Sequence, residues 1–490
     1  MMPDSAKPAS LSRRSLLKGA AGVGAAAAAS VFLPPNVRKA LASTSAPKPG
    51  TGSINDIEHV VFLMQENRSF DEYFGTFPGV RGFGDPNAIK LPGGNSVFQQ
   101  PDPSHADGYL LPFWMDTATT SAQATPGTDH SWQTQHAAWD NGAMDGWVAA
   151  KGAQTMGYFK QADIPFHWAL ASAFTLCDAY HCSVLGPTNP NRLYMWTGMI
   201  DPNGTGGGPI TDDSPAYNNP IVSWTTYPER LTAAGISWRV YQEYDNYDDN
   251  ALAWCKQYAT ADTSSVLWQS AMIKKPAGWF EDDALNDRLP QVSWLVAPSA
   301  QCEHPDWSPA AGAQYIASKI DAIAANPEVW AKTAFILMYD ENDGYFDHVL
   351  PPTAPAGTAD EYVDGAPIGL GFRVPCTIVS PWTVGGYVAT DTFDHTSLIQ
   401  FLEKRFGVNE PNISAWRRAT CGDLTSAFQF GSSAAFPSGN QALTVPSTTV
   451  TLLSAQKEIA DNPAPAVPAV NTPPVQQTTK RTGYLRPAPQ

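Results

Sequence analysis

Short apolar runs that end directly in acidic or polar residues recur along this chain, and they limit the folds that it can adopt. Runs with the length and β-branching of buried strands span residues 57–64, 236–241, 291–297, 333–339 and 375–380. Helical patterns at 310–325 and 397–406 lie between them. Strands that alternate with helices predict an α/β fold with a mostly parallel sheet.

The polar residues at the ends of two of these runs predict where a site would lie. Glu66 and Asn67 follow the first run, and Asp340 and Glu341 follow the fourth. In open parallel sheets, ligands bind beyond the carboxyl ends of the strands. We therefore expect these four side chains to meet at one edge of the sheet.

The densest group of ionisable residues is the segment 339–348, which holds four acids and His348. Carboxylate oxygens suit hard divalent cations, and a histidine can complete a transition-metal site. A solvated acidic turn is the alternative interpretation. The buried run that leads straight into the acids favours a site.

Thr188 follows Gly186 and Pro187 and precedes Asn189 and Pro190, which predicts that it stands at the start of a helix. The dipole and the free N–H groups of a helix N-terminus favour an anion such as phosphate or an alkoxide. A neighbouring metal would activate the hydroxyl as a nucleophile. Threonine is also a common N-cap without a chemical role, and the sequence leaves that alternative open.

Four histidines follow an acid directly and stand in predicted loops or at element ends: His130, His304, His348 and His395. An isolated histidine is more often a hydrogen-bonded structural residue than a ligand. We interpret four others in that way: His59, His105, His136 and His167.

Together these segments resemble the bacterial phospholipase C and acid phosphatase family, a branch of the alkaline-phosphatase-like superfamily. The matching motifs occur in family order at 65–71, 180–194, 303–305, 339–348, 373–381 and 393–397. The resemblance implies a three-layer α/β/α fold with a mostly parallel central sheet, loop-rich insertions and a site at the strand ends.

The resemblance also implies roles for individual residues. Thr188 would be the nucleophile, and His304 and His130 would be the other catalytic groups. Asn67, His130 and His304 would bind substrate. One or more divalent ions are expected as cofactor, with Ca, Zn, Mn and Mg all open. The predicted metal ligands are Glu66, Asn67, Thr188, Asp340, Glu341, His348 and His395.

One position departs from the family pattern, in which Asn-Gly-Gly follows Asp-Glu. Here Asp343 replaces the first glycine. Because aspartate tolerates positive φ better than most residues, we expect the turn to survive.

The predicted function is an exported phospholipase C that cleaves the glycerol-side phosphodiester of phosphatidylcholine-type lipids to diacylglycerol and a phosphorylated head group. The rings of Trp132, Trp139, Trp147 and Trp196 could hold a quaternary ammonium group, or they could be packing residues. A broad acid phosphatase acting on soluble phosphate monoesters is the first alternative. A catalytically inactive surface binding protein is the second.

The net charge of the chain limits the classes of partner that it can bind. The formal charge of −16 argues against nucleic acid and against tight adhesion to anionic lipid, while transient contact with a membrane surface stays open. Residues 1–42 carry Arg13 and Arg14, an apolar run and the small residues 40–42, as in a twin-arginine export signal. A membrane anchor is the alternative. We expect export by the twin-arginine machinery to the periplasm, the cell wall or the medium.

The amino-acid composition also predicts where the linker, the catalytic domain and the C-terminal tail begin and end. We expect a linker over 43–55, one catalytic domain over 56–455 and a Pro-rich tail over 456–490. Within the domain, residues 76–165 show little periodicity and predict a loop-dominated insertion that shapes the site. The tail is expected to be extended or disordered, or to wrap over the surface.

Overall fold

The central sheet contains seven strands in the order β13-β6-β12-β9-β1-β8-β7. A computed structural model describes residues 33–43, 46–431 and 463–478 of the chain. Strand β12 runs antiparallel to both of its neighbours, and the other four pairings are parallel. The mostly parallel sheet is thus confirmed. Its strands are β1 (His59–Gln65), β6 (Thr175–Cys177), β7 (Trp238–Gln242), β8 (Val292–Val296), β9 (Thr333–Tyr339), β12 (Cys376–Val379) and β13 (Val388–Ala389).

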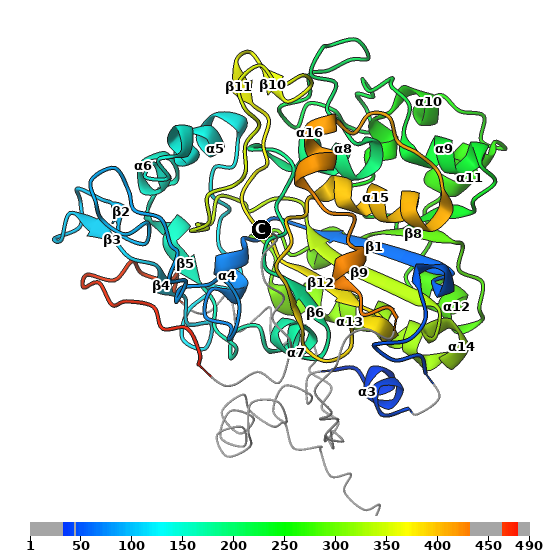
Figure 1. Cartoon of the computed structure of the whole chain (residues 1–490), viewed down its shortest axis with the longest axis horizontal. Coiled ribbons are helices and arrows are strands. Elements are labelled where there is room, and N and C mark those ends of the chain that lie inside the picture. The colour runs from blue at the N-terminus through cyan, green and yellow to red at the C-terminus, as the bar shows by residue number, and fades with distance from the viewer. Residues whose placement is uncertain (1–32, 44–45, 432–462, 479–490) are drawn as a thin grey trace, which may run out of the picture.

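Helices cover both faces of this sheet and complete the three predicted layers (Figure 1). One face carries α8 (Thr188–Thr197), α9 (Tyr227–Ala233) and α15 (His395–Phe406). The other carries α7 (Pro165–Ala173), α12 (Trp279–Leu285), α13 (Pro309–Ala325) and α14 (Pro327–Trp330). Alternate residues of β1 point to opposite faces, so Phe62 packs in the first core and Leu63 in the second.

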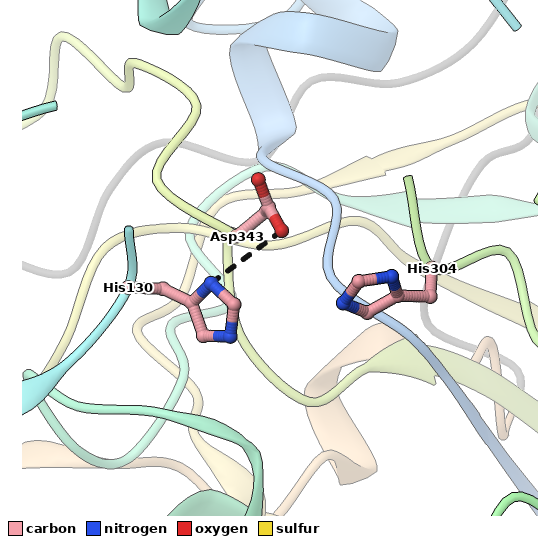
Figure 2. A group of neighbouring side chains, drawn as sticks. All are labelled: His130, His304 and Asp343. Atoms are coloured by element: carbon pink, nitrogen blue, oxygen red, sulfur yellow. Dashed lines mark ion pairs between the residues drawn. The ribbon is translucent and has the colours of Figure 1, made fainter. Parts of the chain in front are cut away.

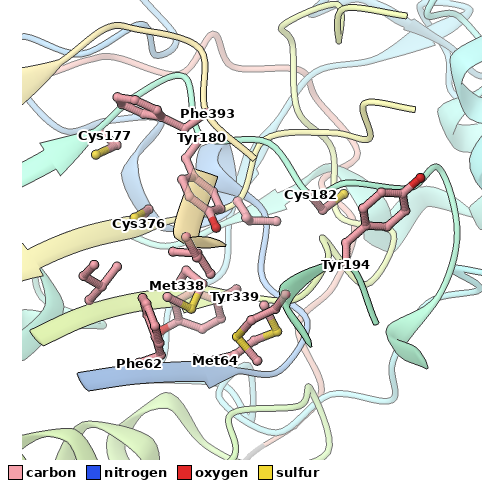
Figure 3. Close-up of a cluster of buried hydrophobic side chains, with 14 of the residues drawn as sticks. Phe62, Met64, Cys177, Tyr180, Cys182, Tyr194, Met338, Tyr339, Cys376 and Phe393 are labelled. Carbon is pink, nitrogen blue, oxygen red and sulfur yellow. The ribbon is translucent and has the colours of Figure 1, made fainter. Parts of the chain in front are cut away.

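The core around β1 and β9 is closely packed up to the strand ends. Phe62 and Met64 of β1 lie beside Met338 and Tyr339 of β9, as Figure 3 shows. Every residue of both strands is buried, as expected for strands covered on both faces. All six cysteines lie within the described residues, and none forms a disulfide.

The predicted insertion over 76–165 contains only short elements: α5 (Trp132–Trp139), α6 (Trp147–Lys151), β2 (Gln100–Pro101), β3 (Tyr109–Leu110), β4 (Phe113–Trp114) and β5 (Gly157–Tyr158). Residues 463–478 of the tail are extended and lie along this insertion (red in Figure 1). Ser121 donates its N–H to the Pro463 carbonyl, and Gln477 donates to the Thr76 carbonyl. This part of the tail wraps over the surface.

The N-terminal described segment forms α3 (Pro35–Ala42), which packs on α13. The backbone N–H and side-chain amide of Asn36 donate to the Asp321 carboxylate, and Val37 is buried. Most of the predicted export signal, residues 1–32, lies outside the described residues. Among the helices of the described ranges, none is long and apolar enough to cross a bilayer. The other elements are α4 (Phe70–Phe74), α10 (Lys256–Ala259), α11 (Val266–Ala271), α16 (Ala415–Thr420), β10 (Tyr362–Val363) and β11 (Ala366–Pro367).

Candidate active site

The adjacent ends of β1 and β9 bring two pairs of polar residues together. Gln65 pairs with Tyr339 in the parallel register, so the residues that follow each strand leave the sheet side by side. The backbone N–H of Asn67 donates to Asp340 Oδ1 at 3.0 Å. Glu66, Asn67, Asp340 and Glu341 are all buried. The two distant sequence motifs therefore form one polar cluster at the carboxyl edge of the sheet.

Thr188 reaches this cluster from the first residue of α8. Its Oγ1 lies 3.4 Å from Glu66 Oε2 and 3.4 Å from Asn67 Oδ1. The helix takes Pro187 as its N-cap, and no side chain caps it. The alternative that Thr188 is a simple N-cap is therefore wrong, because its hydroxyl faces the acids and not the helix backbone.

Arg192 lies four residues beyond Thr188 and supplies a guanidinium to the cluster. Its Nε donates to Glu66 Oε1 at 3.0 Å and lies 3.4 Å from Asp340 Oδ2. Its Nη2 lies 3.1 Å from Asp249 Oδ2. Arg192 and Asp249 had no predicted role. The i, i+4 spacing on a predicted helix would have placed Arg192 on the face of Thr188.

Burial and mutual repulsion raise the pKa values of the carboxyl groups in this cluster. Burial and the neighbouring Asp249 raise the pKa of Glu66 to about 8, against the opposing effect of Arg192. Burial raises the pKa of Asp249 to about 7. The pKa values of Asp340 and Glu341 also lie well above their ordinary values, mainly because of burial. The single positive charge of Arg192 cannot neutralise the carboxyl groups of Glu66, Asp249, Asp340 and Glu341. A further cation would therefore be stabilised in this cluster.

The cluster contains oxygen atoms of the kind that bind divalent cations. Asp340 Oδ2 and Glu341 Oε1 are buried and have no hydrogen-bond partner among the described residues. A buried carboxylate oxygen without a hydrogen bond is costly, and beyond Arg192, which lies 3.4 Å from Asp340 Oδ2, a further cation would satisfy these oxygens. With Glu66 Oε2, Asn67 Oδ1 and Thr188 Oγ1, they make an oxygen set of the kind that hard cations prefer.

His130, His304 and Asp343 form a second group, whose ligand atoms lie within 4.8 Å of one another and could hold an ion (Figure 2). His130 Nδ1 lies 2.7 Å from the Thr128 carbonyl and 3.5 Å from Asp343 Oδ1. The Nδ1–H therefore donates, and Nε2 faces Asn67 Nδ2 at 3.4 Å. The rings of His130 and His304 lie 6.2 Å apart. Both predicted catalytic histidines thus flank the cluster on the Asn67 side.

The backbone of Asp343 adopts the left-handed conformation, with φ at +61°. The expectation that aspartate could replace glycine in this turn is confirmed. The side chain does more than fit, because Asp343 Oδ2 accepts the Thr128 N–H at 2.6 Å while Oδ1 faces His130. Asp343 was absent from the predicted site residues, although its departure from the family pattern was the signal that could have found it.

His395 and His348, both predicted as metal ligands, contact other groups and do not join the oxygen set. His395 Nε2 lies 2.7 Å from the backbone carbonyl of Asp340, and its Nδ1 lies 3.0 Å from the Tyr180 hydroxyl. Both ring nitrogens are therefore occupied. Burial lowers the pKa of His395 to about 4, so the ring is neutral and supports the Asp340 backbone.

His348 belongs to a separate buried cluster. Its Nδ1 lies 2.6 Å from Asp71 Oδ2, and Arg373 pairs with both Asp71 and Asp347. The side chains of Asp71, Asp347 and His348 lie close enough to hold an ion. Because Arg373 already supplies the cation, this cluster is a salt-bridge network that joins α4 to the acidic segment after β9.

A family model described as the phosphoesterase family matches residues 57–409 of this chain. The chain belongs to the phosphoesterase family. A non-hemolytic phospholipase C from Pseudomonas aeruginosa is 50% identical over 86% of this chain and 64% of its own length. Phospholipase C A from Mycobacterium tuberculosis is 41% identical over 86% of this chain and 85% of its own length. The chain thus spans less than two thirds of the Pseudomonas relative.

Among solved structures, a protein of the alkaline phosphatase superfamily from Vibrio parahaemolyticus is similar over 80% of this chain and 77% of its own. The identity is 11% and the TM-score 0.32. A likeness at that level supports no argument about the site of this phosphoesterase.

The tryptophans near the motifs of this phosphoesterase are packing residues. Trp196 is buried and stacks on Trp294 at 4.7 Å, and Trp147 is buried against Phe372 at 4.3 Å. The Trp132 ring lies 4.3 Å from His136. These contacts favour the packing interpretation over a head-group cage.

Proposed function

We propose that this phosphoesterase is a phospholipase C that cleaves the glycerol-side phosphodiester of phosphatidylcholine-type lipids with Thr188 as nucleophile. The observation that carries the proposal is the convergence of the Thr188 hydroxyl with the Glu66 carboxylate and the Asn67 amide oxygen, in a cluster that Asp340 joins from the second strand end. Relatives named phospholipase C at 41% and 50% identity support the substrate class.

The first step joins Thr188 to phosphorus. Oγ1 attacks, the bond between phosphorus and the glycerol oxygen breaks, and diacylglycerol leaves. A divalent ion held by Glu66, Asn67, Asp340 and Glu341 would supply positive charge for the nucleophile and the phosphoryl oxygens. Arg192 orients the Glu66 carboxylate throughout. The Asn67 side chain contributes to the set without adding charge.

Thr188 Oγ1 loses its proton as it attacks, and the leaving glycerol oxygen needs one. The two flanking histidines are the candidates to accept the first proton on a free ring nitrogen and to pass it to the leaving oxygen. His130 donates Nδ1–H to Thr128, which fixes the ring and turns Nε2 toward Asn67. His304 stands across from it. Water then hydrolyses the phosphothreonine, which releases the phosphorylated head group and restores Thr188. General acid–base help of this kind contributes about 10²- to 10⁴-fold in rate.

Substitution at Thr188 tests the nucleophile. We expect Thr188→Ala to abolish turnover of p-nitrophenylphosphorylcholine while circular dichroism stays unchanged. Thr188→Ser, which keeps a hydroxyl, should retain part of the activity. Full activity in Thr188→Ala would overturn the mechanism.

Parallel assays with phosphatidylcholine and p-nitrophenyl phosphate test the substrate class. A phospholipase C turns over the lipid far faster than the monoester. The reverse preference would identify an acid phosphatase. Purified protein that binds no divalent ion and cleaves neither substrate would identify an inactive binding protein.

We also propose that the chain is exported by the twin-arginine route, on the basis of Arg13, Arg14 and the apolar run that follows them. In a bacterial host with this pathway, the protein with Lys at both positions should stay in the cytoplasm. N-terminal sequencing of the exported protein should begin at Ser43. Equal export of both forms would contradict the proposal.

A further inference from the structure

Two loops beside the site each expose a tyrosine ring. Tyr217 is 62% exposed and Tyr244 is 70% exposed, whereas most aromatic residues of the described chain are buried. Single exposed apolar residues are common on protein surfaces and carry no meaning alone. The position of these two relative to the site, and to one another, is what distinguishes them.

The first loop is bound to the residue next to the nucleophile. The backbone N–H of Asn189 donates to Asp213 Oδ1 at 2.8 Å, and the Asn189 side-chain amide donates to the Pro215 carbonyl at 2.7 Å. Tyr217 follows two residues later. Its ring is therefore carried on a loop that is hydrogen-bonded to the start of α8.

The second loop is bound to the same site through Asp249 and Tyr247. Asp249 lies 3.1 Å from the Arg192 guanidinium. The Tyr247 ring packs 5.8 Å from the His304 ring, so this loop also contacts a candidate catalytic histidine. Tyr247 and Asp248 both adopt positive φ, at +53° and +61°, which reverses the chain direction after Tyr244.

The two loops also contact each other. The backbone N–H of Tyr217 donates to Asp248 Oδ2 at 3.2 Å. Lys274 Nζ donates to the Tyr244 carbonyl at 3.3 Å and lies 6.0 Å from the centre of the Tyr217 ring. The two tyrosines and Lys274 thus form one surface at the site, which we call the tyrosine rim.

We propose that the tyrosine rim docks the site on the surface of a zwitterionic phospholipid bilayer. This inference rests on the proposed function, in which the scissile bond lies in the head-group layer. Tyrosine has an apolar ring and a polar hydroxyl, and it concentrates at membrane–water interfaces. Because the two loops contact Asn189 and Arg192 of α8, a rim that carries two such rings would hold the nucleophile at the depth of the lipid phosphate.

The surrounding charge identifies the lipid class. Asp212 and Asp245 are exposed near the tyrosines and outnumber the single positive charge of Lys274 in the rim, and the whole chain carries −16. Negative charge of this kind opposes binding to anionic lipid. Choline head groups instead present quaternary ammonium groups, which are attracted to the faces of tyrosine rings. The rim therefore fits a phosphatidylcholine surface.

The test compares a membrane substrate with a soluble one. In the full chain carrying Tyr217→Ser and Tyr244→Ser, sedimentation with phosphatidylcholine vesicles should show about tenfold weaker binding. Turnover of the vesicle lipid should fall by a similar factor, while turnover of p-nitrophenylphosphorylcholine stays unchanged. Replacing part of the phosphatidylcholine with phosphatidylserine should not strengthen wild-type binding.

Leu285→Ser provides a matched control. Leu285 is 53% exposed at the end of α12, and nearby Asp287 contacts His59 at the start of β1, away from the site. This variant should bind and cleave vesicles like the wild type. Tyr217→Trp with Tyr244→Trp should also retain vesicle binding, because tryptophan keeps the interfacial ring.

Two outcomes would contradict the proposed role of the tyrosine rim in membrane docking. One is unchanged vesicle binding in the double serine variant. The other is an equal loss of turnover on both substrates, which would assign the rings to the site itself. Failure of the proposed function looks different, since wild-type protein would then cleave neither choline ester. Vesicle binding is measured without turnover, so it decides the role of the rim in that case as well.

Discussion

Thr188 and Arg192 lie one helical turn apart on α8, and each contacts a different oxygen of the Glu66 carboxylate. Thr188 Oγ1 lies 3.4 Å from Oε2, and Arg192 Nε lies 3.0 Å from Oε1. The guanidinium therefore fixes the plane of the carboxylate and leaves the oxygen that faces Thr188 available. Helix α8 supplies both the proposed nucleophile and the group that orients its neighbour.

Removing the Arg192 guanidinium should destabilise the metal-free protein. Arg192→Met leaves the buried Glu66, Asp249 and Asp340 without their cation, and an uncompensated buried charge costs about 3–5 kcal/mol. Urea denaturation in EDTA measures the change in unfolding free energy. Arg192→Lys keeps the positive charge but loses the planar guanidinium that contacts several carboxylates. Its free energy of unfolding should therefore lie between those of Arg192→Met and the wild type. A free energy of unfolding equal to that of the wild type would show that the carboxylates do not depend on Arg192.

Stability of the metal-free protein should fall as the pH rises from about 7 to 8. The pKa of Glu66 is about 8 in the folded protein against 4.5 as its ordinary value, so folding requires a proton that rising pH removes. The buried neutral histidines, such as His395, have no opposing effect there, because they are already deprotonated in the unfolded chain.

Thermal unfolding in EDTA at the two pH values measures this effect, with Glu66→Gln as the control that lacks the titrating group. A saturating divalent ion should reverse the trend, since the ion competes with the protons. A melting temperature that rises with pH in EDTA, in wild type and control alike, would contradict the prediction.

The sequence predicts the parts of this fold that are encoded locally. Strand β9 lies at its predicted residues, 333–339, because a strand buried on both faces is a continuous apolar run that ends in charge. Strands β6 and β13 went unpredicted, since three and two residues leave no periodic pattern. The antiparallel direction of β12 was also not predictable, because it depends on a long connection and not on the strand itself.

The same distinction holds at the site. The acids after β1 and β9 were predictable because each directly follows a strand. Asp249 was not, since it lies in an acidic loop and its partner Arg192 comes from a distant helix. An acidic residue before a histidine does not predict which way the imidazole ring points, so the sequence could not distinguish His130 from His395. Their hydrogen bonds separate them, with one at the oxygen set and the other behind Asp340.

Metal content should distinguish the oxygen set from the supporting histidines. Asp340→Asn removes the charge of a buried carboxylate whose Oδ2 accepts no hydrogen bond among the described residues, and we expect it to lose the divalent ion. His395→Asn and His348→Asn should keep the wild-type stoichiometry, because those rings bond to a backbone carbonyl and to Asp71. Elemental analysis by mass spectrometry after gel filtration measures the bound ion. Loss of the ion in His395→Asn, with the fold intact, would restore that residue as a ligand.

Asp343 should matter through its side chain and not through its backbone conformation. Asp343→Gly keeps the left-handed turn but loses the carboxylate that binds Thr128 and faces His130. We expect kcat to fall by about 10- to 100-fold, since a general acid contributes at least that much when well placed. Asp343→Asn can still accept from Thr128, so it should lose less. Steady-state kinetics on p-nitrophenylphosphorylcholine measure both variants, and a glycine variant as active as wild type would mean that Asp343 only forms the turn.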